Sequence, residues 1–272
     1  MQVTFSSIRK HAIIVALLAL ASAALHEGDL HAATDGFGFH VPRGSTGNVF
    51  RGCRAWFNSD DGYDLINTCE PVLIENCCTF YNGFDLSFKP LGDGNGFKLG
   101  GYGTWSESQL PAAIPRHVIR QSLAVRNRSA GFYANHQPGG IDLINNSAYL
   151  NSVNFNLLCR DSNNSKDVSG YNHKLINNLG YKGRSEVTNI NRAACNLAAN
   201  SFDLKLRLSD KDFHGLNESD LMQPRQPNGE QPIMPFMKLK LGNDAIDKGV
   251  DARPSFKGKA PDLGAFEFGV LK

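Results

Sequence analysis

The chain has 272 residues, enough for one large domain or two ordinary ones. Its 28 Lys and Arg nearly balance its 26 Asp and Glu, so the net charge of +2 provides no electrostatic basis for binding nucleic acid. The 27 glycines and frequent Asn residues lie between many short apolar runs. This pattern indicates an all-β chain with many turns.

The first residues have the features of a secretory signal. Arg9, Lys10 and His11 form a basic segment, and the apolar run that follows, 12–25, is too short for a comfortable membrane span. We therefore predict that 1–24 is a signal peptide and that the mature chain is secreted, to the cell exterior or the periplasm. The alternative is an N-terminal anchor or a buried helix.

The stretch 53–64 places three carboxylates, Asp60, Asp61 and Asp64, within five residues. Like charges at this spacing repel, and the usual compensation is a hard cation such as calcium, which takes carboxylate ligands in irregular geometry. The spacing is not that of an EF-hand. A solvated acidic turn is the alternative.

Five segments align without gaps and indicate an internal repeat: 49–58, 73–82, 118–127, 142–151 and 174–183. Their second position is large and apolar, the seventh small, the eighth apolar and mostly aromatic, and the tenth is Asn in four of the five. Such columns predict a stacked solenoid, in which each turn buries its apolar face only against its neighbours. Asn columns suit turns, where side-chain amides hydrogen-bond from coil to coil.

A second strand accompanies the repeat, with glycine, an apolar residue, any residue x and a further apolar residue. It occurs at 36–39, 62–65, 96–99, 131–134 and, more weakly, 154–157. Alternation along a strand turns the apolar residues inward and x toward solvent.

Stacking brings distant polar residues together. Coils are about 4.8 Å apart, so the x residues Asp64 and Lys98 should be neighbours on consecutive coils. Asp35 and Asp61 both directly precede the glycine and should stack as well. The prediction is a group of four carboxylates with an amine one coil away; a plain salt bridge between Asp64 and Lys98 is the alternative.

Insertions interrupt the coils between residues 82 and 93 and between 100 and 116, and such insertions often map to the binding face. The repeat fades after Gly183. We predict coils over 25–200. Residues 201–272 should form an irregular extension of the same domain, packed along or across the end of the solenoid, where an open sheet edge needs cover.

The six cysteines match no zinc pattern, and export permits disulfides whose connectivity the sequence does not reveal. Cys77 and Cys78 are adjacent, so on a strand they would face opposite ways.

The chain resembles polysaccharide lyase family 9, the calcium-dependent pectate lyases. The stretch 47–64 looks like the family signature, 35–37, 94–101 and 261–267 match the same family, and the similarity covers about residues 34–268. The resemblance implies a right-handed parallel β-helix, here of about five coils. Family members have further coils before the position of Asp35, whereas here the signal-like segment precedes it, so we expect the site on the first coils.

The resemblance also implies a set of site residues and a reaction. Lys98 matches the family's catalytic base, and the matching calcium ligands are Asp35, Asp60, Asp61 and Asp64.

Pectate is cleaved by β-elimination, in which the C5 proton, α to the carboxylate, is removed and O4 leaves. A cation beside the carboxylate stabilises the carbanion-like transition state, and a neutral base must reach the proton. A lysine titrates near 10.4, so a nearby cation that lowers its pKa would favour alkaline pH.

Arg120, Arg126 and Arg128 lie on the next coil and could clamp uronate carboxylates, although a solvated basic face is an equal alternative. His117, His136 and His173 have no spacing that suggests a metal site or a triad.

Three functions remain open. The first is a secreted, monomeric pectate lyase that acts on polygalacturonate with Ca²⁺, binding neither nucleic acid nor, after signal cleavage, membrane. The second is a non-catalytic β-helix that binds pectin or cell wall, or a truncated relic. The third is a lyase for another uronate polysaccharide, because the elimination chemistry does not choose the sugar.

Overall fold

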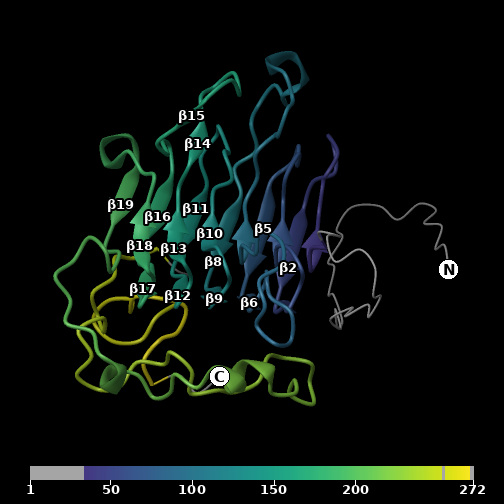
Figure 1. The fold of residues 1–272 in the computed structure, drawn as a ribbon. Helices are drawn as coiled ribbons and strands as arrows, with labels where there is room; N and C mark the ends of the chain where they lie inside the picture. Colours follow the sequence, from purple (N-terminus) through teal and green to yellow (C-terminus); the bar gives the residue numbers. More distant parts are fainter. Residues whose placement is uncertain (1–33, 253–254, 270–272) are drawn as a thin grey trace.

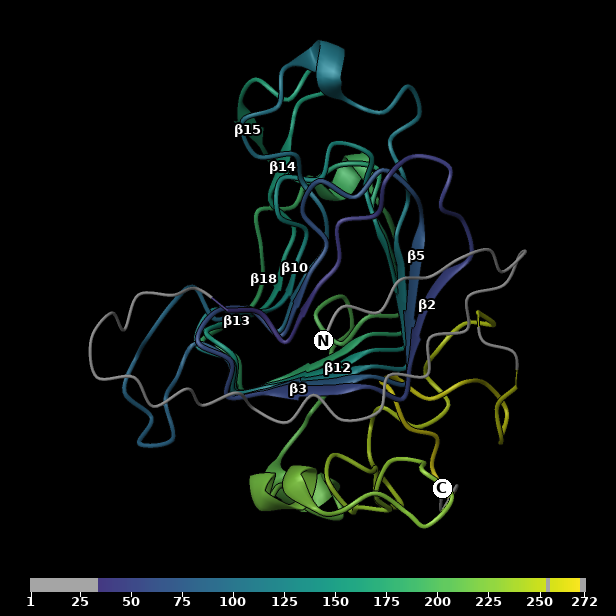
Figure 2. The same ribbon diagram turned by 90° about the vertical axis from the view of Figure 1, so that its right-hand side faces the viewer.

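The computed structural model describes residues 34–252 and 255–269. The predicted signal peptide and the start of the predicted coils lie outside these residues. The described chain winds into a parallel β-helix, as predicted, and its coils form three sheets. Figure 2 looks nearly along the coil axis and shows the sheets as walls of a roughly triangular tube.

Each coil contributes one strand to each wall, except that the last described coil, with β18 and β19, adds none to the third. The first sheet has the order β1-β4-β7-β10-β13-β18, the second β2-β5-β8-β11-β16-β19, and the third β3-β6-β9-β12-β17. The strands of the first sheet are Phe37–Gly38, Tyr63–Asp64, Phe97–Lys98, Ala130–Tyr133, Val153–Asn156 and Ser185–Thr188. Those of the second are Asn48–Arg51, Val72–Glu75, Val118–Arg120, Asp142–Ile144, Lys174–Ile176 and Asn196–Ala198. Those of the third are Arg54–Trp56, Cys78–Phe80, Leu123–Val125, Ser147–Tyr149 and Leu179–Tyr181.

The columns of the repeat are the register of the second and third sheets. Phe50 pairs with Ile74, and Ala55 pairs with Thr79, as the gapless alignment predicts. The small seventh residue points into the tube, while the aromatic eighth residue points out, where Phe80 joins a separate apolar cluster. Size alternation therefore encodes the two faces of the third sheet.

The turns between these sheets explain the remaining columns. The fourth position of each segment adopts a positive φ, for example 66° at Gly52 and 55° at Asn76, a conformation that Gly and Asn tolerate best. The tenth-position amides form the predicted ladder: Nδ2 of Asn82 donates to Oδ1 of Asn127 at 2.8 Å, and Nδ2 of Asn127 to Oδ1 of Asn151 at 3.0 Å. Buried amides are thus satisfied from coil to coil.

Stacked aromatic rings fill the tube behind the first sheet. Successive centroids are 4.8, 4.8, 5.0 and 5.2 Å apart along Phe37, Tyr63, Phe97, Phe132 and Phe155. Because these rings alternate with the x residues, the stack sets which side chains face outward.

The coils continue beyond the recognisable repeat. After Gly183 they include β18 and β19, which lie within the predicted limit of residue 200. The extension after them lies along the outer face of the third sheet rather than across an end, with Phe213, Phe236 and Leu239 packed among the outward aromatics. Its short 3-10 helices are Asp210–Asp212 and Glu218–Met222. The covered face was already apolar, which explains why the tail binds there.

Two insertions stand away from the coils. The antiparallel pair β14 (Cys159–Arg160) and β15 (Asp167–Val168) and the 3-10 helix Glu107–Gln109 project from one corner of the tube. A further 3-10 helix, Arg192–Ala194, precedes β19.

Neighbouring cysteines face opposite sides of the wall. Cys77 belongs to the inner cluster and Cys78 to the outer one, as expected. The described residues contain no disulfide. Over this same part of the chain, every helix is too short or too polar to cross a bilayer.

Candidate functional site

The outer face of the first sheet carries one x residue per coil. The register pairs Gly38 with Asp64, Asp64 with Lys98, Lys98 with Tyr133, and Tyr133 with Asn156. We call this column the ledge. The predicted adjacency of Asp64 and Lys98, 34 positions apart in sequence, is confirmed.

A second column runs beside the ledge and holds Asp35, Asp61 and Asn95. The backbone N–H of Asp61 donates to Oδ1 of Asp35 at 3.1 Å, and the N–H of Asn95 donates to Oδ1 of Asp61 at 2.7 Å. The Asn95 amide also donates to that oxygen, at 2.9 Å. Each carboxylate is thus fixed by a donor of the following coil.

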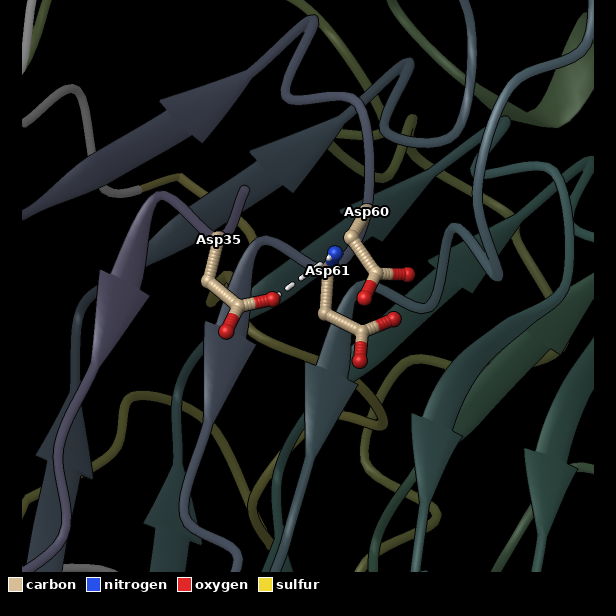
Figure 3. Close-up of side chains that lie close together, drawn as sticks. All are labelled: Asp35, Asp60 and Asp61. Atoms are coloured by element: carbon tan, nitrogen blue, oxygen red, sulfur yellow. Dashed lines mark hydrogen bonds between the residues drawn. The ribbon is translucent and has the colours of Figure 1, made fainter. Parts of the chain in front are cut away.

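Asp60 joins this column from the preceding turn (Figure 3). Its Oδ1 accepts the N–H of Asp93 at 2.7 Å, from the insertion after residue 82. Asp35, Asp60 and Asp61 each offer a carboxylate oxygen, and these oxygens all lie within 4.8 Å of one another. Three of the four predicted carboxylates therefore converge as expected.

Burial makes this group electrostatically costly. Asp61 is fully buried, and burial raises its pKa to about 7, with Asp60 adding repulsion and Lys98 opposing the rise. Burial is also the main cause that raises the pKa of Asp35, and repulsion from Asp64 is the second. From the described residues, Oδ2 of Asp61 accepts no hydrogen bond, although Nζ of Lys98 is 3.0 Å away.

Lys98 lies between the two aspartates of the preceding coil. Its Nζ is 3.0 Å from Oδ2 of Asp61 and 3.0 Å from Oδ2 of Asp64, and its side chain is 14% exposed. Burial favours the neutral amine, but attraction to the two carboxylates outweighs it and holds the Lys98 pKa above its ordinary value.

The expectation that x residues face open solvent is wrong for Asp64, which is 5% exposed. Its Oδ2 pairs with Lys98, and its Oδ1 accepts the N–H of Ile66 at 2.7 Å. The carboxylate therefore turns along the ledge toward the amine. Alternation along a strand predicts which face of the sheet a side chain lies on, but not how exposed that side chain is.

The three arginines are not brought together. Arg120 lies on the second sheet, where its guanidinium is 2.6 Å from Glu75, and Arg126 pairs with Glu218 of the tail at 3.2 Å. Arg128 alone lies near the site, since it donates to the carbonyl of Gly92 in the insertion that contacts Asp60.

The sequence reasoning missed Asn95, which holds Asp61 with two hydrogen bonds. The signal was present, because Asn95 precedes the glycine of its strand as Asp35 and Asp61 do. Of the three unassigned histidines, His117 and His173 are structural: each is buried and accepts a backbone N–H of the preceding coil at its Nδ1, from Val72 and Ile141 respectively.

The carboxylate group fits a hard cation. The donors are oxygens, they converge from two coils, and Oδ2 of the buried Asp61 has the Lys98 amine as its ionic partner but no other hydrogen-bond donor among the described residues. Calcium prefers such ligands and tolerates their irregular geometry.

Comparisons with known proteins agree with the fold. A family model described as "Pel9A-like, right handed beta helix region" matches residues 8–172. Pectate lyase L of Dickeya chrysanthemi is 38% identical over 238 residues, 86% of this chain and 51% of that protein. A solved structure of pectate lyase Pel9A is 36% identical with a TM-score of 0.71, covering 86% of this chain and 54% of that one. A solved rhamnogalacturonan lyase is 43% identical with a TM-score of 0.70, covering 76% and 52%.

The chain thus spans about half the length of these relatives. The family match covers most of the coils, and the Pel9A structure shares the fold of this chain. Both findings agree with the resemblance seen in the sequence motifs. On this evidence the chain belongs to the Pel9A-like, right-handed β-helix family, polysaccharide lyase family 9.

Proposed function

We propose that this chain cleaves polygalacturonate by β-elimination, with Lys98 as the base and with Ca²⁺ held by Asp35, Asp60, Asp61 and Asp64. The observation that carries the proposal is the position of the Lys98 amine, on the coil that follows the carboxylates and within 3.0 Å of two of them. A uronate placed over the carboxylates would present its C5 proton to this amine.

The chain's own residues would act as follows. Asn95 and the coil backbone hold the carboxylates in place, so no reorganisation is needed when substrate arrives. The Lys98 amine, when it is neutral, takes the C5 proton. The C5–H electron pair forms the C4–C5 double bond, and the C4–O4 pair leaves with O4.

The protonation state of Lys98 couples the two halves of the site. Asp61 and Asp64 keep the amine charged, which makes it a poor base. Calcium held by the carboxylates would supply Lewis-acid stabilisation of the uronate carboxylate and would offset the negative charge that holds the Lys98 proton.

The test is the absorbance of the unsaturated product from polygalacturonate at about pH 8–10. Calcium should support the reaction and a chelator should abolish it. Lys98→Arg keeps the charge but cannot act as a base, since guanidinium stays protonated; it should lose the rate and retain calcium binding. Full activity of Lys98→Arg, or no lysis by the parent chain with calcium, would contradict the proposal.

A second candidate substrate has specific support. The rhamnogalacturonan lyase is 43% identical to this chain, the highest identity among the three relatives described above. A lyase for another uronate polymer would use the same amine and carboxylates, and parallel assays on both polymers decide between them. Calcium-dependent binding without turnover, unchanged in Lys98→Ala, would instead favour a non-catalytic pectin-binding protein.

The location of the protein is also a proposal. We infer from residues 1–24 that the chain is secreted and works outside the cytoplasm, and we separately propose that it is a monomer. N-terminal sequencing of the exported protein and its mass in solution would test both points.

A further inference from the structure

A polar cluster stands on the coil after Lys98 and takes no part in the proposed elimination. The hydroxyl of Tyr133 lies 2.9 Å from Nε2 of His136, and Nδ1 of His136 lies 2.8 Å from Oδ1 of Asp167. Tyr133 is in register with Lys98 on the ledge. The cluster therefore adjoins the proposed base.

The backbone is bent to place His136 there. Asn135 and His136 have φ of 49° and 62°, two consecutive left-handed residues that carry side chains. Asn adopts this conformation readily, whereas it is less usual for His, and two such residues in succession form a sharp turn. The turn brings the imidazole back over Tyr133, with the rings 5.9 Å apart and nearly perpendicular.

Asp167 arrives from outside the coils. It lies on β15, in the hairpin that projects from the corner of the tube (Figure 1). Nε of Arg160 is 3.2 Å from the same carboxylate oxygen, and Arg160 also donates to the carbonyl of Gly103. The hairpin is thus anchored while it carries a carboxylate to the ledge.

These contacts define which hydrogen bond Tyr133 can offer. The contact between Nδ1 and Asp167 lacks the geometry of a hydrogen bond, but the negative carboxylate favours electrostatically the tautomer with its proton on Nδ1. That tautomer leaves Nε2 as an acceptor for the Tyr133 hydroxyl. The phenol stays protonated, because burial raises the pKa of Tyr133 to about 12 and Asp167 adds to the rise. With its proton directed to His136, the Tyr133 oxygen presents lone pairs to the ledge.

We propose that Tyr133 is a specificity-determining residue, which accepts a hydrogen bond from a hydroxyl of the sugar unit bound beside the cleaved uronate. His136 and Asp167 are positioning residues that act through it. A carboxylate at this position has no proton to donate and meets the negative charge of Asp167, so the unit should bind with a hydroxyl edge toward Tyr133. The inference rests on the proposed function, because it places substrate along the ledge.

The test is a set of variants measured on polygalacturonate and on a rhamnogalacturonan backbone, with initial rates over a range of concentrations. Tyr133→Phe keeps the ring and removes the acceptor. Loss of one hydrogen bond should raise KM about threefold to tenfold with kcat unchanged, on whichever polymer is cleaved. Tyr171→Phe is the matched control, since its hydroxyl bonds the carbonyl of Arg160 in the same hairpin; its KM should not change.

A double-mutant cycle separates positioning from folding. His136→Ala and Asp167→Asn should raise KM in the parent chain and have no further effect in Tyr133→Phe. A KM for Tyr133→Phe within about twofold of the parent value, a loss confined to kcat, or additive effects in the cycle would each overturn the inference. If no polymer is cleaved, the proposed function fails, and calorimetric binding of the same polymers to parent and Tyr133→Phe still decides whether the contact exists.

Discussion

Replacing Lys98 by Met tests whether the carboxylates form a cation site that the lysine partly satisfies. Met keeps the length of the side chain and removes the charge. The Lys98 side chain is 14% exposed and its amine pairs with Asp61 and Asp64 at 3.0 Å, so its loss leaves a mostly buried group of like charges. Removing one partner of a buried pair costs about 3–5 kcal/mol. Because Asp61 can take up a proton, we expect a somewhat smaller cost, about 2–4 kcal/mol.

For a domain of this size such a loss lowers Tm by roughly 5–10 °C. The assay is thermal unfolding at about pH 8, above the pKa of Asp61, first in chelator and then in excess calcium. Calcium should raise the Tm of Lys98→Met more than that of the parent chain. The control is Lys182→Met, which removes an exposed partner of Asp210 and should change little. An unchanged Tm in chelator, or equal calcium shifts, would refute the reasoning.

Three further predictions concern stability. Burial lowers the pKa of His117 and His173 to about 4, while the unfolded chain binds these protons near 6.5. The free energy of unfolding should therefore fall as pH decreases from about 6.5 toward 4, and His117→Asn should reduce that slope in denaturant titrations. Gly62→Ala would place a Cβ 2.1 Å from Oγ1 of Thr79 and should cost about 1–3 kcal/mol in urea unfolding. Phe236→Ala removes a fully buried ring between the tail and the third sheet and should cost about 3–5 kcal/mol in the same assay, whereas an undocked tail would show no change.

The register between coils was predictable because equivalent positions of successive coils have the same surroundings. Ala55 and Thr79 are small since both face the inside of the tube, and Trp56 and Phe80 are aromatic since both face outward. Counting positions from the strand glycine then placed Lys98 beside its carboxylate partner, although many residues intervene.

Features that do not repeat were not predictable. The direction in which Asp64 turns depends on the amine and on the Ile66 N–H, which periodicity does not encode. The partner of Arg126 comes from the tail, whose sequence has no period, and Asp167 comes from an inserted hairpin. In each case the contact joins a coil to a segment outside the repeat.

The coil explains why three acidic side chains, those of Asp35, Asp60 and Asp61, can share so small a space. Oδ1 of Asp35 and Oδ1 of Asp61 each accept a backbone N–H one coil further on, and Oδ1 of Asp60 accepts one from the insertion. The main chain thus orients each carboxylate through one oxygen and leaves the second to face its neighbours. Since these N–H donors belong to the main chain, they orient the carboxylates without an ion, and a proton or a cation can offset the charge that remains. Lys98, on the coil that follows, offsets part of it, so in the proposed site its protonation depends on what the carboxylates bind.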